Sequence, residues 1–411
     1  MLNQKYTFTV IKMARTQIIL SSGKDQSIRR FHPWVFSGAI KKIKGDAKDG
    51  DVVNVYDNKD EFLGTGHYQD SSIAVRIFSF TEVEPSQNFW RKKIQTAYDF
   101  RKSIGLTNNP DTNCYRLVFA EGDGLPGLII DYYNGTCVMQ CHSIGMHLAK
   151  KDIVEALKET YDGNLKAVYD KSAETLPKKF AEGVKNEYLF GKGEEEHHTV
   201  KENNLNFWID WKSGQKTGFF IDQRENRQML ARYCEGKNVL NTFCYTGAFS
   251  IYAMKAGAKL IHSVDSSKRA IDLTKQNFQM NTSAEGGRID CAHYCSDVFD
   301  FLKEKKDFYD VMVLDPPAFA KHHNVRHNAL MGYKRLNTEA LKQIKSGGIL
   351  FTFSCTQVID RALFEKTILS AAIIAGRNVR VLHHLSQAPD HPVNIFHPEG
   401  EYLKGLVLFV E

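Results

Sequence analysis

The chain has 411 residues, which is too long for one ordinary core or for a small binding module. We expect two or three domains of roughly 100 to 200 residues each. Hydrophobic residues make up 42% and charged residues 25% of the chain, a composition that excludes a disordered or fibrous protein. The formal charge of +6 permits a polyanionic partner but does not by itself indicate one.

Apolar residues and cysteines are distributed as in a cytoplasmic protein without a membrane partner. The longest apolar stretches, such as 368–375, fall short of the roughly 20 residues that span a bilayer. The N-terminus carries charges where a signal peptide would be apolar. The eight cysteines include no CxxC pair, which indicates free thiols. Cys291 and Cys295 flank His293 on an expected strand, but they supply too few ligands for structural zinc, so no metal is predicted.

The first half of the chain predicts two small domains. Short alternating runs at 52–56, 62–68 and 73–78 indicate a small β-barrel or sheet, which we assign to residues 14–85. Helical periodicity at 90–104 and 150–161 surrounds a strand-rich stretch at 115–144, which predicts a central α+β domain over 86–205. The polar run 191–204 is typical of a hairpin or loop before the last domain.

From residue 206 to 411 buried strands alternate with helices. The expected strands are 238–241, 260–265, 289–294, 311–315, 349–354, 379–385 and 403–410, and the expected helices are 246–256, 267–280, 298–303, one that ends at 345, and 361–375. This alternation predicts an α/β domain with a doubly wound, mostly parallel, Rossmann-like sheet. Ligands of such sheets bind at the carboxyl ends of the strands, so strand ends are the first candidate sites.

The turn after the first of these strands indicates the cofactor. It runs from Asn241 through Tyr245 to Gly247 and contains one glycine where a dinucleotide enzyme would have three, which argues against a pyrophosphate. Asp265 ends the second strand and is positioned to accept hydrogen bonds from ribose hydroxyls, and Asp297 follows the third strand and could accept an adenine amino group. A single aspartate at a strand end is more often a helix cap, but the series favours S-adenosylmethionine.

Two further strand ends predict the chemistry. Asp315, followed by two prolines, ends the fourth strand, where carbonyls and a carboxylate could grip a nucleobase, as in amino-group methyltransferases. Cys355 ends the fifth strand, which we expect beside the fourth. A thiolate that adds to carbon 6 of cytosine makes carbon 5 nucleophilic, with Asp315 stabilising the charge on the ring. Cys355 could instead be a small buried residue that fills a strand end, but beside Asp315 we favour the nucleophile.

The same segments carry a family resemblance. Residues 212–226 (KSGQKTGFFIDQREN), 314–319 (LDPPAF), Ser354-Cys355 and 398–405 (PEGEYLKG) resemble the bacterial large-subunit ribosomal RNA cytosine-5 methyltransferases of the RlmI type. Residues 32–38 (HPWVFSG) resemble the start of the N-terminal PUA domain of that family, and 116–128 resemble its central domain. The resemblance implies a PUA module for RNA, a class I domain that binds S-adenosylmethionine, and methylation of carbon 5 of a cytosine in RNA, most of all large-subunit ribosomal RNA.

The resemblance also implies roles for single residues. Lys216, Phe220, Asp222 and Arg224 would line or close the cofactor site, although Asp222 and Arg224 could otherwise form a surface pair worth little. The loop after the prolines carries basic residues that could meet a phosphate backbone or simply be solvated: Lys321, His322, His323 and Arg326.

Two rival functions stay open. One is an N7-guanine or amino-group RNA methyltransferase on the same scaffold, which would not need Cys355. The other is a nonenzymatic RNA-binding or ribosome assembly factor that keeps the fold. The sequence also leaves open whether the protein is a homodimer.

Overall fold

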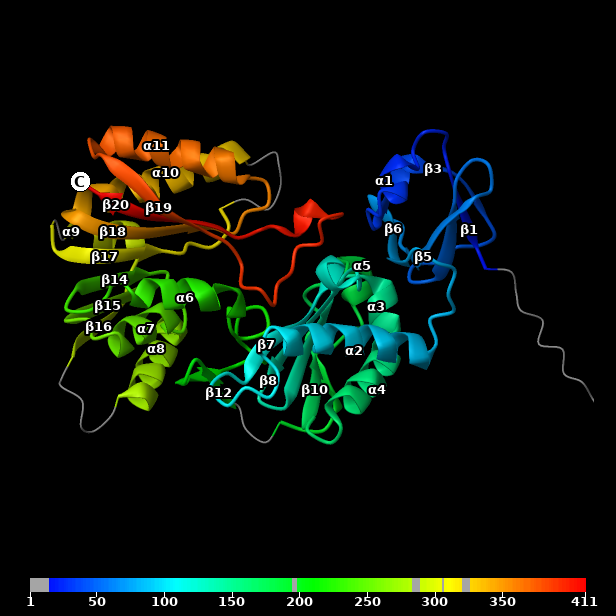
Figure 1. The fold of residues 1–411 in the computed structure, drawn as a ribbon, viewed down its shortest axis with the longest axis horizontal. Coiled ribbons are helices and arrows are strands. Elements are labelled where there is room, and N and C mark those ends of the chain that lie inside the picture. Colours follow the sequence, from blue (N-terminus) through cyan, green and yellow to red (C-terminus); the bar gives the residue numbers. More distant parts are fainter. Residues whose placement is uncertain (1–14, 194–197, 283–288, 305–306, 320–325) are drawn as a thin grey trace, which may run out of the picture.

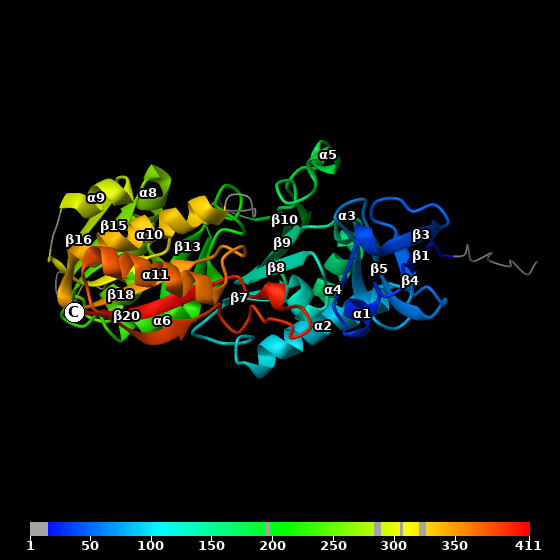
Figure 2. The same ribbon diagram turned by 90° about the horizontal axis from the view of Figure 1, so that it is seen from above.

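The computed structural model describes residues 15–193, 198–282, 289–304, 307–319 and 326–411. Within these residues the strands form four sheets of six, five, two and seven strands. The three larger sheets follow one another along the long axis of the molecule in both views (Figures 1 and 2). Among the described residues, no helix is both long enough and apolar enough to cross a membrane.

The N-terminal sheet has the strand order β2-β6-β5-β4-β1-β3. Its strands are β1 Gln17–Leu20, β2 Trp34–Phe36, β3 Ile40–Lys44, β4 Val52–Tyr56, β5 Phe62–Tyr68 and β6 Ile73–Ser79, with the short helix α1 Gln26–Arg29. Alternate strand residues such as Val53, Val55 and Val75 are fully buried and form its core, because successive side chains of a strand point to opposite faces. The three strands that the sequence predicts here are confirmed.

The central sheet has the order β11-β10-β9-β8-β7. Its strands are β7 Cys114–Phe119, β8 Leu128–Tyr133, β9 Thr136–Cys141, β10 Ala167–Asp170 and β11 Glu187–Phe190, and its helices are α2 Gln87–Ser103, α3 Ile144–Leu148, α4 Lys150–Tyr161 and α5 Lys178–Ala181. Trp90, Ile94 and Ala97 recur at helical spacing on the buried face of α2 and join the core of this sheet. The predicted central α+β arrangement follows from this packing.

A hairpin connects the central sheet to the last one. It pairs β12 His198–Glu202 with β13 Leu205–Ile209. Asn203 and Asn204 at its turn have φ of 50° and 62°, the left-handed pair that tight hairpins require and that asparagine tolerates. The described part of the predicted polar run is therefore a hairpin, and it straddles the expected boundary at 205/206.

The C-terminal sheet has the order β16-β15-β14-β17-β18-β20-β19. Its strands are β14 Asn238–Thr242, β15 Leu260–Asp265, β16 Asp290–Cys295, β17 Tyr309–Leu314, β18 Ile344–Ser354, β19 Val379–Leu385 and β20 Lys404–Val410. Its helices are α6 Arg224–Ala231, α7 Ala248–Lys255, α8 Lys268–Asn281, α9 Val298–Glu304, α10 Arg326–Gln343 and α11 Arg361–Ala375. The first five strands pair in parallel, which confirms the doubly wound sheet.

Two apolar cores cover the opposite faces of this sheet. Val311 and Val313 of β17 join the core with α6, α7 and α8, whereas Met312 and Leu314 join the core with α9, α10 and α11. A strand buried on both faces has the continuous apolar sequence seen here. The strand order reverses at β14, between β15 and β17, so the carboxyl ends of these strands form the switch-point crevice.

Two details differ from the expectations. The strand β18 begins at Ile344, earlier than expected, because Ile344 pairs with Tyr309 across a register shift and α10 ends at Gln343. The last strand β20 lies between β18 and β19 and is antiparallel to both. The chain between β19 and β20 leaves the sheet and runs toward the other two domains, where its short helix η5 Pro398–Gly400 lies (Figure 1).

Candidate functional site

Three residues of the turn after β14 have a positive φ, and one of the three is a glycine. Phe243, Tyr245 and Gly247 have φ of 54°, 47° and 77°. Gly247 is the residue just before α7, and a Cβ at this position would lie 2.6 Å from Cγ2 of Thr274 on α8. The turn therefore needs glycine for close packing of two helices as well as for its backbone angle.

Asp265 at the end of β15 is held by two backbone amides. Its carboxylate accepts from the N–H of Tyr245 at 3.0 Å and from the N–H of Ser267 at 2.9 Å. A carboxylate offers about four acceptor positions, so both oxygens keep capacity for a further donor. The geometry suits the predicted binding of ribose hydroxyls.

Asn241 at the end of β14 carries an unsatisfied polar atom. Its amide nitrogen donates to Oγ of Ser250 at 2.9 Å, while Oδ1 is buried and has no hydrogen-bond partner among the described residues. A buried acceptor without a donor costs free energy, so this position suits a ligand that brings an N–H or O–H group. Asn241 and Asp265 thus fit the amine-bearing nucleoside that the sequence predicts.

Phe220 and Tyr245 meet at the same edge. Their ring centroids are 5.2 Å apart and nearly perpendicular. The Tyr245 hydroxyl donates to the carbonyl of Gly218 at 3.2 Å and accepts from the N–H of Gln215 at 3.2 Å. The segment with the predicted residues Lys216 and Phe220 therefore packs directly on the cofactor turn.

Asp297 caps a helix. The residue is exposed, and its Oδ1 accepts from the N–H groups of Phe299 at 2.8 Å and Asp300 at 3.2 Å, at the start of α9. This is the capping role that a strand-end aspartate commonly has. Its contact with adenine stays a prediction.

Asp315 is a half-buried carboxyl with a perturbed pKa. Burial and the neighbouring charge of Asp222 raise the pKa of Asp315 to about 7, although Gln223 donates to its Oδ2 at 2.9 Å and favours the charged form. Asp222 and Gln223 belong to the short helix η3 Ile221–Gln223, and the hydroxyl of Tyr402 donates to Asp222. At neutral pH Asp315 is therefore present in both protonation states.

Cys355 lies just after β18, next to the strand that ends before Asp315. Its side chain is half-buried. Burial and the charge of Asp315 raise the pKa of the Cys355 thiol to about 11, while the positive charge of Lys216 acts in the opposite direction. The electrostatic coupling supports the expected proximity of Cys355 and Asp315.

Lys404 is a site residue that sequence reasoning missed. It is 3% exposed, pairs with Ser354 across β18 and β20, and its Nζ donates to the carbonyl of Thr356 at 2.9 Å. Burial lowers the pKa of Lys404, whereas the nearby Cys355 raises it. A lysine inside the apolar run 403–410 was the available signal, because lysine is rarely buried without a partner.

Arg224 corrects the surface-pair expectation. The residue is 2% exposed and its guanidinium donates to Asp390 at 2.9 Å and to the carbonyl of Cys114 at 3.1 Å, with Glu202 at 3.6 Å. Burial alone would raise the pKa of Asp390, but Arg224 and His391 hold it well below its usual range. Arg224 thus joins three distant segments instead of lying on the surface, and its part in the cofactor site stays a prediction.

The other basic candidates are only partly described. Lys321, His322 and His323 lie outside the described residues, and Arg326 is exposed at the start of α10. Their contact with phosphates stays a prediction.

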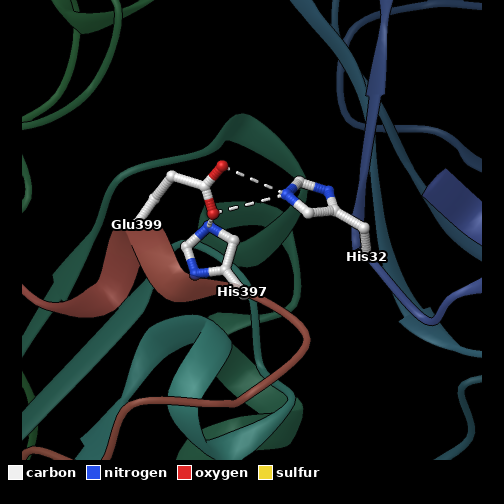
Figure 3. A group of neighbouring side chains, drawn as sticks. All are labelled: His32, His397 and Glu399. Carbon is white, nitrogen blue, oxygen red and sulfur yellow. Dashed lines mark hydrogen bonds and ion pairs between the residues drawn. The ribbon is translucent and has the colours of Figure 1, made fainter.

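His32, His397 and Glu399 form a cluster where the N-terminal domain meets the segment before β20 (Figure 3). The Nε2 atom of His32 lies 3.4 Å from the Glu399 carboxylate, and Nδ1 of His32 accepts from the N–H of Trp34 at 3.2 Å. Since Nδ1 is an acceptor, the ring proton lies on Nε2, the atom that a metal would need. The contact therefore fits a hydrogen bond between domains better than a metal centre.

Comparison with known proteins identifies the family. The PUA-like domain family matches residues 18–80, and the S-adenosylmethionine-dependent methyltransferase family matches residues 156–397. Ribosomal RNA large subunit methyltransferase I of Aeromonas hydrophila is 39% identical over 95% of this chain and 98% of its own length, and that of Photobacterium profundum is 40% identical over 96% and 100%. The chain belongs to the ribosomal RNA large subunit methyltransferase I family.

Solved structures agree on the fold of this large subunit methyltransferase I family member. A SAM-dependent methyltransferase from Streptococcus mutans has a TM-score of 0.81 at 24% identity and covers 96% of this chain and 99% of its own. A methyltransferase complexed with SAH has a TM-score of 0.82 at 24% identity with the same coverage. The predicted fold class and the S-adenosylmethionine cofactor are confirmed.

Proposed function

We propose that this enzyme transfers a methyl group from S-adenosylmethionine to carbon 5 of a cytosine in RNA, most of all large-subunit ribosomal RNA, through a covalent bond between Cys355 and carbon 6. The observation that carries the proposal is the pair of Cys355 and Asp315 at the ends of neighbouring parallel strands. The printed names of the curated relatives support the ribosomal RNA substrate, and the PUA-like match supports RNA binding.

The chemistry requires a nucleophile because carbon 5 of cytosine is unreactive. The Cys355 thiol gives up its proton, and the thiolate forms a bond to carbon 6 while the electron pair of the C5–C6 double bond shifts toward carbon 5. S-adenosylmethionine would supply an electrophilic methyl group, to which carbon 5 bonds as the methyl–sulfur bond breaks and S-adenosylhomocysteine leaves. A base then removes the proton from carbon 5, the double bond re-forms, and the bond between sulfur and carbon 6 breaks with return of the electron pair to Cys355.

Asp315 suits the ring of the substrate in this scheme. Ring N3 of cytosine is an acceptor, so it needs a donor, and a carboxyl whose pKa is about 7 is partly protonated at neutral pH. A proton donated to N3 stabilises the negative charge that develops on the ring when sulfur adds. The burial and the Asp222 charge that raise the pKa of Asp315 therefore serve the proposed role.

Different residues of the proposed cofactor site contact different parts of S-adenosylmethionine. Asp265 holds the ribose and Asn241 accepts from the amine end, while Phe220 and Tyr245 enclose the site from the neighbouring segment. Lys216, Gly247, Asp222 and Asp297 complete the proposed set. Arg224 contributes by fixing the segment next to Asp222.

Analysis of methylated nucleosides tests the proposal. The purified chain is incubated with deuterium-labelled S-adenosylmethionine and unmodified large-subunit ribosomal RNA, which is then digested and examined by mass spectrometry. Labelled 5-methylcytidine is the expected product, and Asp265→Ala should reduce it. Labelled N7-methylguanosine or a methylated amino group would contradict the proposal and favour the rival chemistry, and RNA binding without methylation would favour an assembly factor.

A further inference from the structure

A cleft lies where the N-terminal domain, the central domain and the segment before β20 meet. Its volume is about 330 Å³. Phe31 and Phe80 line it from the first domain, Lys93 and Glu121 from the second, and Asn394 and Phe396 from the C-terminal segment. We call this site the junction cleft.

Aromatic rings dominate one wall of the junction cleft. The ring of Phe31 contacts Phe80 at a centroid distance of 5.2 Å and Phe396 at 5.3 Å. Phe31 is 49% exposed and Phe396 is 47% exposed, although soluble proteins seldom leave neighbouring large apolar side chains in water. Phe31 also has φ of 64°, a backbone conformation that bulky residues rarely adopt. The wall is thus a continuous aromatic surface that is open to a ligand.

Polar groups occupy the rest of the cleft. Nζ of Lys93 donates to the carbonyl of Gly124 at 3.1 Å and has further N–H groups to offer a ligand, and the exposed Arg30 precedes Phe31. The carboxylate of Glu121 accepts from Nε1 of Trp34 at 2.8 Å, which keeps this anion fixed beside the cleft. Exposed aromatic rings next to a cation are the pattern that binds single-stranded nucleic acid.

The walls are tied together by contacts between domains. Trp34 binds Glu121, and His32 points at the Glu399 carboxylate three residues after Phe396 (Figure 3). The amide of Asn394 donates to the carbonyl of Glu121 at 3.4 Å. The cleft is therefore formed before a ligand arrives, and it lies on the segment that continues into Tyr402 and Lys404 at the proposed active site.

We propose that the junction cleft binds one unpaired nucleotide of the RNA substrate, with its base packed against the exposed rings of Phe31 and Phe396 and its phosphate near Lys93. The volume is in the range of small-ligand pockets. This inference rests on the proposed function, since it names where an RNA substrate is gripped outside the methylation site.

Three phenylalanine variants test the assignment. Phe31→Ala and Phe396→Ala remove the stacking surface, and Phe36→Ala is the matched control, because Phe36 is also 49% exposed in the same domain but does not line the cleft. The probe is a fluorescein-labelled single-stranded RNA of about 15 nucleotides without a hairpin, and its binding is measured by anisotropy at several salt concentrations. Circular dichroism and sedimentation check that each full-length variant is folded and whether its oligomeric state changes.

Loss of stacking should weaken binding without changing the number of phosphate contacts. We expect Phe31→Ala and Phe396→Ala to lose at least about fivefold in affinity with an unchanged salt slope, and Phe36→Ala to stay within about twofold of the unaltered protein. If all three variants bind RNA as tightly as the unaltered protein, the assignment of the cleft as a nucleotide site is wrong. The proposed function still stands in that case, provided that the unaltered chain methylates RNA. A change of oligomeric state in folded cleft variants with unchanged RNA affinity would make the surface a protein interface and overturn the proposal too.

Discussion

The half-buried thiol of Cys355 lies among charges that act on it in opposite directions. Burial and Asp315 favour the neutral thiol, whereas the positive charges of Lys216 and Lys404 favour the thiolate. Only the thiolate is a strong nucleophile. Reactivity at this position therefore depends on the cations that surround the sulfur.

Lys404→Met should make Cys355 less reactive. Loss of the buried cation raises the pKa of the thiol above about 11, so alkylation by iodoacetamide at pH 9 should slow by about three- to tenfold, which corresponds to roughly half to one pKa unit. Mass spectrometry of the Cys355 peptide gives the rate. The exposed Cys295 is an internal control whose rate should not change. Equal rates for Cys355 in both proteins would show that Lys404 does not act on the sulfur.

Asp315→Asn should change the pH dependence of stability. The folded-state pKa of Asp315 is raised to about 7, so the native protein binds this proton more tightly than the unfolded chain and loses stability as the pH rises from about 4 to 7. Asparagine has no such proton. We expect the variant to gain about 4 kcal/mol relative to the unaltered protein at pH 8 but little at pH 4, measured by urea unfolding. A constant difference between pH 4 and pH 8 would contradict the raised pKa.

Strand-end residues were predictable from the sequence, and their partners were not. Asp265 and Gly247 stand at positions that strand and helix periodicity fixes, so their place at the switch point follows from the alternation alone. The contacts of Tyr402 with Asp222 and of Lys404 with Thr356 join residues far apart in the chain. Local patterns carry no information about such pairs.

At the scale of elements, the segment between β19 and β20 connects the domains. Asp390 in this segment accepts from Arg224 and from the N–H of Arg116 at 2.9 Å, and its carbonyl accepts from Arg101 at 2.7 Å. The segment then supplies Tyr402 to Asp222. The position of the motif 398–405 thus indicates its role, because these residues lead the chain from the contacts between domains into β20 beside Cys355.

Arg224→Met should destabilise the fold strongly. The change leaves the buried carboxylates of Asp390 and Glu202 with one cationic partner fewer, which costs about 3 to 5 kcal/mol. Arg380→Met is the control, because Arg380 also contacts a carboxylate, that of Glu411, but 64% of its side chain is exposed, where the loss is about 1 kcal/mol or less. Urea unfolding compares the two. Equal losses in the free energy of unfolding would show that the buried ion pairs of Arg224 stabilise the fold no more than an exposed pair does.

The order of the last strands shows what sequence patterns cannot determine. An apolar run at 403–410 predicts a strand, but its insertion between β18 and β19 depends on the long path of the preceding segment. The early start of β18 similarly depends on its pairing with Tyr309. Both features arise from contacts between segments and leave no periodic signal.

At the scale of the whole molecule, three sheets share contacts instead of standing apart. Residues of the central sheet, such as Cys114 and Tyr133, belong to the same apolar core as residues of the C-terminal sheet. The contact of His32 with Glu399 attaches the N-terminal domain to the segment before β20 (Figure 3). The hydrogen bond from Trp34 to Glu121 attaches it to the central domain. Changes of periodicity in the sequence predict a division into three domains, whereas the packing of the three larger sheets against one another depends on these distant pairs.

Covalent trapping tests the central claim most directly, because it needs the whole molecule to bind RNA and Cys355 to react. The RNA carries 5-fluorocytidine at the methylated position, where fluorine prevents removal of a proton from carbon 5. We predict an adduct with S-adenosylmethionine present that survives denaturation and maps to the Cys355 peptide, and no adduct or methylation with Cys355→Ala. Methylation of ordinary RNA by Cys355→Ala, or an adduct at another cysteine, would contradict the assignment of Cys355 as the nucleophile.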